Sequence, residues 1–118
     1  MFSGLIKRRI FNTIRFSLMG LKYAWKHEEA FRIELLCLVI LLPLALVLGE
    51  TGLQKAALIY SCLFVVIVEL INSAIEATVD LCSTKPHHLA AAAKDMGSAA
   101  VFLSILLVPV VWMLVLTS

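Results

Sequence analysis

Two long stretches of this chain, residues 35–49 and 99–116, contain no charged side chain. A helix needs about 20 mostly apolar residues to cross a bilayer, and a short helical extension brings both stretches to that length. Composition agrees, since 62% of the residues are hydrophobic and 15% are charged, whereas soluble domains are about half apolar and about a quarter charged. We therefore predict an all-α membrane protein whose single domain covers residues 1–118.

The N-terminal segment, residues 5–30, follows a different pattern. Its apolar residues recur at steps of three or four, while Arg8, Arg15 and Lys22 recur every seven residues with Lys26 beside them. This spacing predicts an amphipathic helix with one apolar side and one basic side. Such a helix lies on the membrane surface, with its cations toward the lipid phosphates.

The rest of the chain divides at its turn-forming residues. Gly49 and Gly52 mark a turn, and residues 82–94, which include Pro86, are typical of a connecting loop with a short helical lead-in. The predicted membrane-spanning helices are residues 31–49, 53–80 and 96–116.

The distribution of positive charge predicts the orientation. Lys and Arg number seven in residues 1–34, one in residues 49–55 and two in residues 81–94. Because cytoplasmic segments carry the excess of Lys and Arg, the N-terminus and the 81–94 loop are predicted to be cytoplasmic. Three spans then place the C-terminus outside. The net charge of +2, without basic and aromatic repeats, argues against a nucleic-acid partner.

The segment VELINSAIEATVD, residues 68–80, carries three carboxylates and an amide inside an apolar helix. At about 100° per residue, its polar side chains share one face, extend about 16 Å along the helix and are predicted to meet one partner surface. Hydrogen bonds between helices, an ion or proton path, or a position outside the bilayer are ordinary explanations. However, carboxylates this close repel unless they share a cation or a proton, which favours a functional role. This polar stripe consists of Glu69, Asn72, Ser73, Glu76 and Asp80.

Two further polar groups fall on the predicted cytoplasmic side. In HEEAFRIE, residues 27–34, the four-residue spacing of Glu28 and Arg32 also fits an ordinary surface ion pair. In KDMGSAAV, residues 94–101, Asp95 also fits a helix N-cap, and the small residues allow another backbone to approach closely.

These three groups together have the chemistry of a site for a metal ion and a phosphate. Carboxylates with an amide suit Mg²⁺, a hard cation that prefers oxygen ligands and often bridges phosphates. The ammonium of Lys94 suits a phosphate. The glycine-rich loops of common nucleotide-binding folds are absent, so a nucleotide site here must be built differently.

The motifs ELINSAIEATVD and AKDMGSAAV, with Ala24-Trp25, Glu28, Ala30-Phe31-Arg32 and Glu34 upstream, closely resemble the prokaryotic integral-membrane diacylglycerol kinase family. The resemblance covers nearly the whole chain. It implies a homotrimer in the bacterial inner membrane that uses Mg²⁺ and ATP to phosphorylate diacylglycerol at the cytoplasmic face.

The resemblance also implies roles for individual residues, carried over position by position. Glu69 matches the general base. Glu28 and Glu76 match the metal ligands. The positions that match the nucleotide site are Ser17, Asn72, Glu76, Asp80, His87, Lys94 and Asp95, and those that match the lipid site are Arg9, Glu34, Glu69 and Ser98.

Three other functions compete with this interpretation. The nearest is an undecaprenol kinase on the same fold, because the choice of acceptor depends on a lipid groove that the sequence does not show. A non-enzymatic small membrane subunit predicts that Glu69 and Glu76 are replaceable. A proton-coupled transporter needs a polar path across the whole bilayer, and the uncharged residues 35–49 and 99–116 argue against one.

Overall fold

The computed structural model describes residues 1–118 as four helices and no strand. Three of the helices are long and apolar enough to cross a membrane. The predicted fold class, an all-α chain with three membrane-capable helices, is therefore confirmed. The helices are α1 (Phe2–His27), α2 (Glu29–Leu48), α3 (Gly52–Cys82) and α4 (His88–Leu116).

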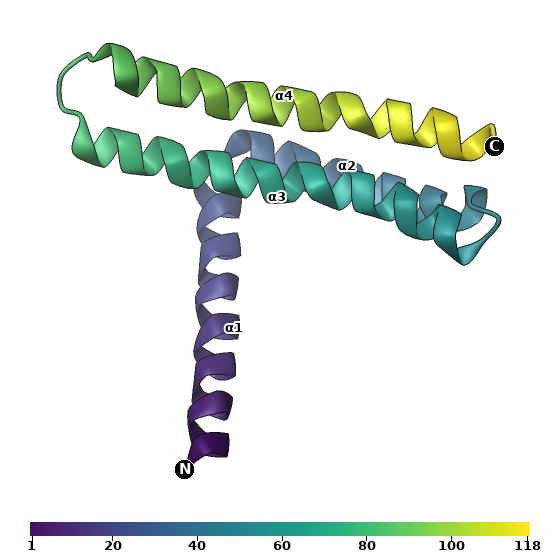
Figure 1. Ribbon diagram of the computed structural model, residues 1–118, viewed down its shortest axis with the longest axis horizontal. Helices are drawn as coiled ribbons and strands as arrows, with labels where there is room; N and C mark the ends of the chain where they lie inside the picture. Colours follow the sequence, from purple (N-terminus) through teal and green to yellow (C-terminus); the bar gives the residue numbers. More distant parts are fainter.

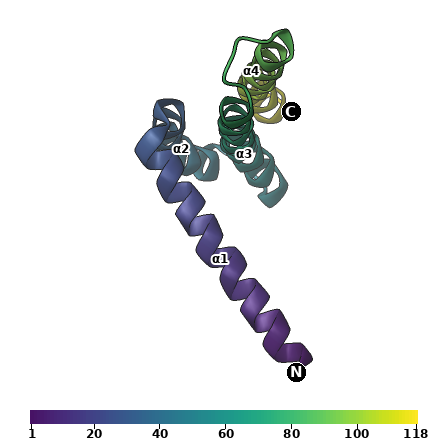
Figure 2. The same cartoon turned by 90° about the vertical axis from the view of Figure 1, so that its left-hand side faces the viewer.

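Helix α3 lies in the middle of the bundle. It packs against α4 on one side and against α2 on the other, as Figures 1 and 2 show. Helix α1 contacts the bundle only near its C-terminal end and points away from the other three helices (Figure 1). This arrangement fits a helix on the membrane surface attached to helices that cross the membrane.

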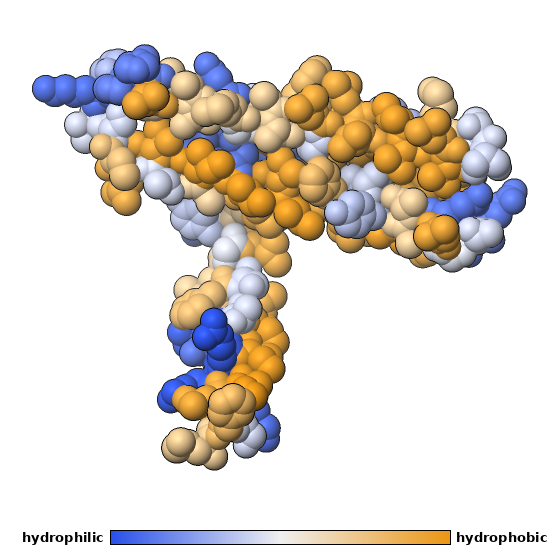
Figure 3. All heavy atoms as spheres, viewed as in Figure 1, coloured by the Kyte–Doolittle hydropathy of each residue, from blue (hydrophilic) through white to orange (hydrophobic).

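Helix α1 has the two-sided character that its sequence predicts. Ala24 is its only buried residue. Figure 3 shows hydrophilic and hydrophobic side chains on opposite sides of this helix. The apolar side has no protein partner within the chain, so it is available to lipid.

A sharp elbow joins α1 to α2 at one residue, Glu28, whose backbone is extended (φ −115°, ψ 107°). The guanidinium of Arg32 donates hydrogen bonds to the carbonyl oxygens of Trp25 (2.8 Å) and Lys26 (3.2 Å). Carbonyl groups in the last turn of a helix lack helical partners, so Arg32 caps α1 and holds the elbow. The alternative expectation of an Arg32–Glu28 ion pair is wrong, since the one salt bridge in the chain joins other residues.

The other two connections are capped locally. The hydroxyl of Thr51 accepts from the N–H of Gln54 (3.1 Å), and the Gln54 side chain accepts from the N–H of Glu50 (2.8 Å). This reciprocal pattern resembles a capping box at the start of α3. At α4 the ring of His87 accepts from the N–H of Leu89 (3.1 Å).

Helix α4 therefore begins at His88, earlier than the expected membrane span. The alternative of Asp95 as an N-cap is wrong, because Asp95 lies inside the helix. The physical reason is the alanine run at residues 90–93, since alanine has the highest helix propensity and continues the helix beyond the apolar segment.

The chain buries few of its residues. Only 14 of 118 are buried, and the main apolar cluster lies between α2 and α3 around Phe31, Leu38 and Val66. The indole N–H of Trp112 donates to the hydroxyl of Ser61 (3.2 Å), which ties α4 to α3. Figure 3 shows apolar side chains along most of the bundle, with polar ones mainly near its two ends. A surface this apolar requires lipid or further protein chains around it.

Candidate active site

A cavity of about 820 Å³ lies between α1 and the last turns of α3. The elbow at Glu28 turns α1 so that one of its faces lies opposite the polar stripe of α3. Four predicted site residues line this cavity: Ser17 and Glu28 from the α1 side, and Glu76 and Asp80 from α3. Residues far apart in sequence are thus brought together within one chain.

The polar stripe passes from buried to exposed along α3. Glu69 is 6% exposed and Asn72 is 8% exposed, whereas Glu76 is half-buried and Asp80 is exposed. Ser73 also lines the cavity. The deep end of the stripe is therefore shielded from water, while the other end opens toward the connecting loop of residues 83–87.

The expectation that the stripe meets one partner surface is wrong. Glu76 and Asp80 face the cavity beside α1, but Glu69 lies close enough to Glu34 of α2 for their carboxyl groups to interact. Asn72 lies against Gly97 of α4. The stripe meets three helices because its side chains spread over about a third of the helix circumference.

Asn72 connects the buried and the open parts of the stripe. Its amide Nδ2 donates to Oε1 of Glu76 at 3.2 Å. Its Oδ1 is buried without a hydrogen-bond partner. The Glu76 carboxylate determines which way the Asn72 amide points. The flipped amide would place Oδ1 of Asn72 against Oε1 of Glu76, and both atoms are acceptors. Asn72 therefore gives Glu76 a hydrogen bond from the buried side of the stripe.

Lys94 brings α4 to the open end of the stripe. Its Nζ lies 2.5 Å from Oδ1 of Asp80, in a pair whose side chains are 43% and 65% exposed. A pair this exposed contributes little to stability. The ion pair instead positions the Lys94 ammonium group beside Asp80, which lines the cavity.

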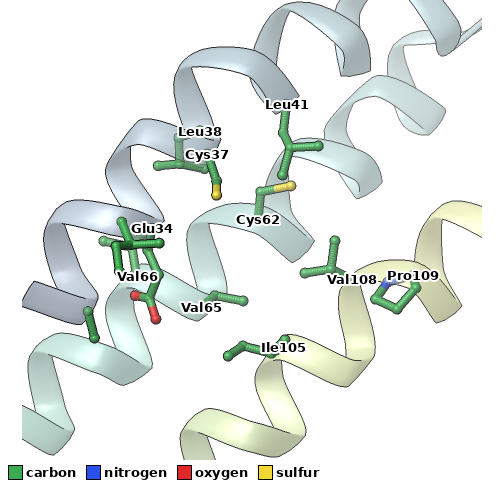
Figure 4. Close-up of a pocket in the computed structure, with 12 residues that line it drawn as sticks. Glu34, Cys37, Leu38, Leu41, Cys62, Val65, Val66, Ile105, Val108 and Pro109 are labelled. Atoms are coloured by element: carbon green, nitrogen blue, oxygen red, sulfur yellow. The ribbon is translucent and has the colours of Figure 1, made fainter.

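A second, apolar cavity of about 430 Å³ lies over α3 between α2 and α4. Figure 4 shows Glu34 at one end of it, with Cys37, Cys62 and Pro109 among the other lining residues. Glu34 is the only charged residue in this lining, and its Oε2 is buried without a partner. A carboxyl group beside an apolar cavity suits a molecule with a polar head and a hydrocarbon chain.

Several predicted site residues lie outside the cavity between α1 and α3. Arg9 is exposed near the free end of α1, and His87 lines a hollow at the loop between α3 and α4. Asp95 and Ser98 are exposed on α4. The single chain therefore does not bring these four residues to the cavity between α1 and α3.

The sequence interpretation missed part of the cavity wall on α1. Gly20, Tyr23 and Ala24 line the cavity together with Ser17 and Glu28. The sequence spacing could have indicated this wall. Ser17, Gly20, Ala24 and Glu28 recur at steps of three or four and so share one helix face. Ser17, Gly20 and Ala24 are small, so larger residues at these positions would fill part of the cavity.

The residues of this cavity fit a metal ion that is held partly by the protein and partly by a bound nucleotide. No three His, Cys, Asp or Glu side chains converge closely enough to bind a metal ion by themselves. Glu28 and Glu76 provide two carboxylates on one cavity. Mg²⁺ is commonly held by one or two carboxylates together with water and substrate phosphates, so this donor set fits a Mg²⁺–nucleotide complex.

Residues 15–116 match the family described as prokaryotic diacylglycerol kinase. The chain belongs to this family. The resemblance in its motifs is thus confirmed, and so is the prediction of an enzyme, a lipid kinase. The prediction of a membrane protein is supported by the same match and by the three membrane-capable helices.

Individual members of the diacylglycerol kinase family align with most of the chain. A diacylglycerol kinase of Haemophilus influenzae is 46% identical over 103 residues, which are 87% of each chain. One of Pseudomonas aeruginosa is 45% identical over 92% of this chain and 89% of its own length. One of Escherichia coli K12 is 40% identical over 93% of this chain and 90% of its own length.

Proposed function

We propose that this chain transfers the γ-phosphate of ATP to the hydroxyl group of diacylglycerol, which forms phosphatidic acid at the cytoplasmic face of the bacterial inner membrane. The observation that supports this most directly is the cavity between α1 and α3. Glu28, Glu76 and Asp80 line this cavity, and the buried Glu69 lies on the same face of α3. The chain that carries them belongs to a lipid kinase family.

Two observations support the proposed cytoplasmic orientation: the distribution of positive charge and the place of the cavity. The cavity lies along the last turns of α3, close to the loop of residues 83–87. That loop and α1 belong to the segments that carry nine of the ten Lys and Arg residues. Because such segments stay in the cytoplasm, the cavity opens on the side where ATP is available.

The proposed reaction needs a base, positioning and charge neutralisation. The acceptor oxygen bonds to the γ-phosphorus, the bond from that phosphorus to the bridging oxygen breaks, and ADP leaves. Glu69 takes the proton of the acceptor hydroxyl. Its burial keeps water away from the reacting oxygen, which limits hydrolysis of ATP.

The nucleotide is held by the open part of the stripe. Glu28 and Glu76 would hold Mg²⁺, which would supply neutralisation of phosphate charge. Lys94 exchanges its partner Asp80 for a phosphate oxygen. Asn72 keeps Glu76 in place through its hydrogen bond. Ser17, His87 and Asp95 complete the proposed nucleotide contacts.

The lipid is held without leaving the bilayer. The apolar cavity beside Glu34 accommodates hydrocarbon, and Glu34 lies next to Glu69, where the hydroxyl must arrive. Arg9 and Ser98 are the proposed contacts to the lipid headgroup region. The apolar side of α1 keeps the helix on the membrane surface.

We propose a homotrimer for the assembled enzyme, which agrees with the large apolar surface of a single chain. Glu28 and Glu76 line one cavity of the same chain. A trimer reconstituted from Glu28→Ala and Glu76→Ala chains should therefore recover no activity, because no chain then supplies both carboxylates. The measurement is the phosphorylation rate of mixtures at several ratios, with parent and Glu28→Ala chains mixed as the control. Recovery above the sum of the separate variants would show that the pair is formed between chains.

The proposed acceptor is tested with radiolabelled ATP in mixed micelles that contain either diacylglycerol or undecaprenol. We expect labelled phosphatidic acid, formed at least about tenfold faster than labelled undecaprenyl phosphate, because acceptor choice reflects differential binding of the reacting complex. A faster rate with undecaprenol would establish the sister activity. No transfer to either lipid would favour a non-enzymatic subunit.

A further inference from the structure

We propose that Gly97 is a positioning residue for the kinase site. Its missing side chain leaves the space in which the Asn72 amide lies, and from that place Asn72 holds Glu76 toward the metal–nucleotide complex. The inference rests on the proposed role of Glu76 as a metal ligand and deepens it, because it names the contact that orients this ligand.

Space is the reason for glycine at this position. No glycine in the chain has a positive φ, so backbone freedom does not explain Gly97. A Cβ added at Gly97 would overlap Oδ1 of Asn72 and lie 3.2 Å from its Cγ. By contrast, a Cβ at Gly4, Gly20 or Gly52 meets nothing within 4 Å.

The contact between Gly97 and Asn72 is local. Gly97 is buried, whereas the next three small residues, 98–100, are exposed. Within the chain, the close contact of this small-residue run is therefore made at Gly97, by the Asn72 side chain. The expectation that the run admits another backbone stays a prediction for residues 98–100.

Asn72 has little freedom to move away from an added methyl group. The residue is 8% exposed, and its Oδ1 has no hydrogen-bond partner. Its Oδ1 points at Gly97 while its Nδ2 donates to Oε1 of Glu76. Because Oδ1 and Nδ2 belong to one rigid, planar amide, a shift of Oδ1 away from Gly97 also moves the donor of the Glu76 hydrogen bond. This 3.2 Å bond is the one side-chain hydrogen bond that Glu76 makes, so its loss frees Glu76 to turn.

The test measures metal binding directly, with Mn²⁺ as the spectroscopic probe for the Mg²⁺ site. Mn²⁺ and a non-hydrolysable ATP analogue are titrated onto the micellar protein and followed by electron paramagnetic resonance. Gly97→Ala and Asn72→Ala should each raise the Kd about tenfold, the effect expected for loss of one hydrogen bond to a charged group. In the Asn72→Ala background, Gly97→Ala should add less than about twofold, because both changes act through the same contact.

The matched controls are Gly4→Ala and Gly52→Ala, which add the same methyl group in open space and should keep the parent Kd. Thermal unfolding of each variant separates folding from binding. If Gly97→Ala does not fold, the Gly97→Ala, Asn72→Ala double variant should fold, because the blocking amide is gone, and should show the Kd of Asn72→Ala. A double variant that also fails to fold would overturn the proposal.

Three binding results would also overturn the proposal: a parent-like Kd for folded Gly97→Ala, a parent-like Kd for Asn72→Ala, or additive effects in the double variant. These results are distinct from failure of the proposed function. A parent protein that binds the Mn²⁺–nucleotide complex and transfers phosphate, while the variants bind equally well, refutes only the role of Gly97. A parent protein that does neither refutes both.

Discussion

Glu69→Gln is expected to reduce phosphate transfer to diacylglycerol to less than a few per cent of the parent rate, while nucleotide binding survives. Glutamine has almost the same shape as glutamate but cannot accept the proton of the acceptor hydroxyl. General base catalysis typically contributes about a hundredfold or more to a rate, which sets the size of the expected loss. Glu69 does not line the cavity that Ser17, Glu76 and Asp80 share, so nucleotide binding should change little.

The measurements for Glu69 are the initial rate with radiolabelled ATP and the Kd for the nucleotide. Glu50→Gln is the control, because Glu50 is an exposed carboxylate in the turn at the opposite end of α3. Glu34→Gln adds a second comparison, since Glu34 interacts with Glu69 from α2. Should Glu69→Gln keep more than a few per cent of the activity, another group must take the proton, and Glu34 is the nearest candidate.

Patterns within single helices predicted much of the fold. Apolar runs predicted the membrane-capable helices, because a helix that crosses lipid must be apolar along its whole length. The spacing of Glu76 and Asp80 predicted that they share a helix face, and both line the same cavity. These predictions succeed because they depend on neighbours within one helix.

Contacts between helices were not predictable in the same way. The capping of α1 by Arg32 depends on the elbow at Glu28, and an ion pair between these two residues fitted the sequence spacing equally well. The place of Asn72 against Gly97 depends on how α4 packs on α3. Neither contact has a periodic signal, since each joins one side chain to one point on another element.

The predicted roles of Arg9, His87, Asp95 and Ser98 come from resemblance, and they stay predictions. The chain by itself does not bring them to the cavity between α1 and α3. Each is exposed. This is the distribution expected for residues that act only when nucleotide, lipid or a neighbouring chain is present.

The second large effect is expected at the metal ligands. Glu76→Gln should raise the Mg²⁺ concentration for half-maximal rate at least about tenfold and lower the maximal rate strongly. The change preserves shape but removes a charge and a hard oxygen ligand, and a loss of about 1.4 kcal/mol in binding already gives a tenfold effect. Glu28→Gln should do the same, because Glu28 lines the same cavity from the elbow.

The effects of replacing Glu28 and Glu76 on Mg²⁺ affinity are also expected to be coupled. If Glu28 and Glu76 hold one ion, the double variant should lose less affinity for Mg²⁺ than the sum of the single losses. Glu29→Gln is the matched control, because Glu29 is the exposed neighbour of Glu28 and does not line the cavity. The measurement is the rate as a function of Mg²⁺ at fixed ATP. A Mg²⁺ dependence of Glu76→Gln that matches Glu29→Gln and the parent would remove the metal role, and Glu76 would then serve only to pair with Asn72 in the packing of α3.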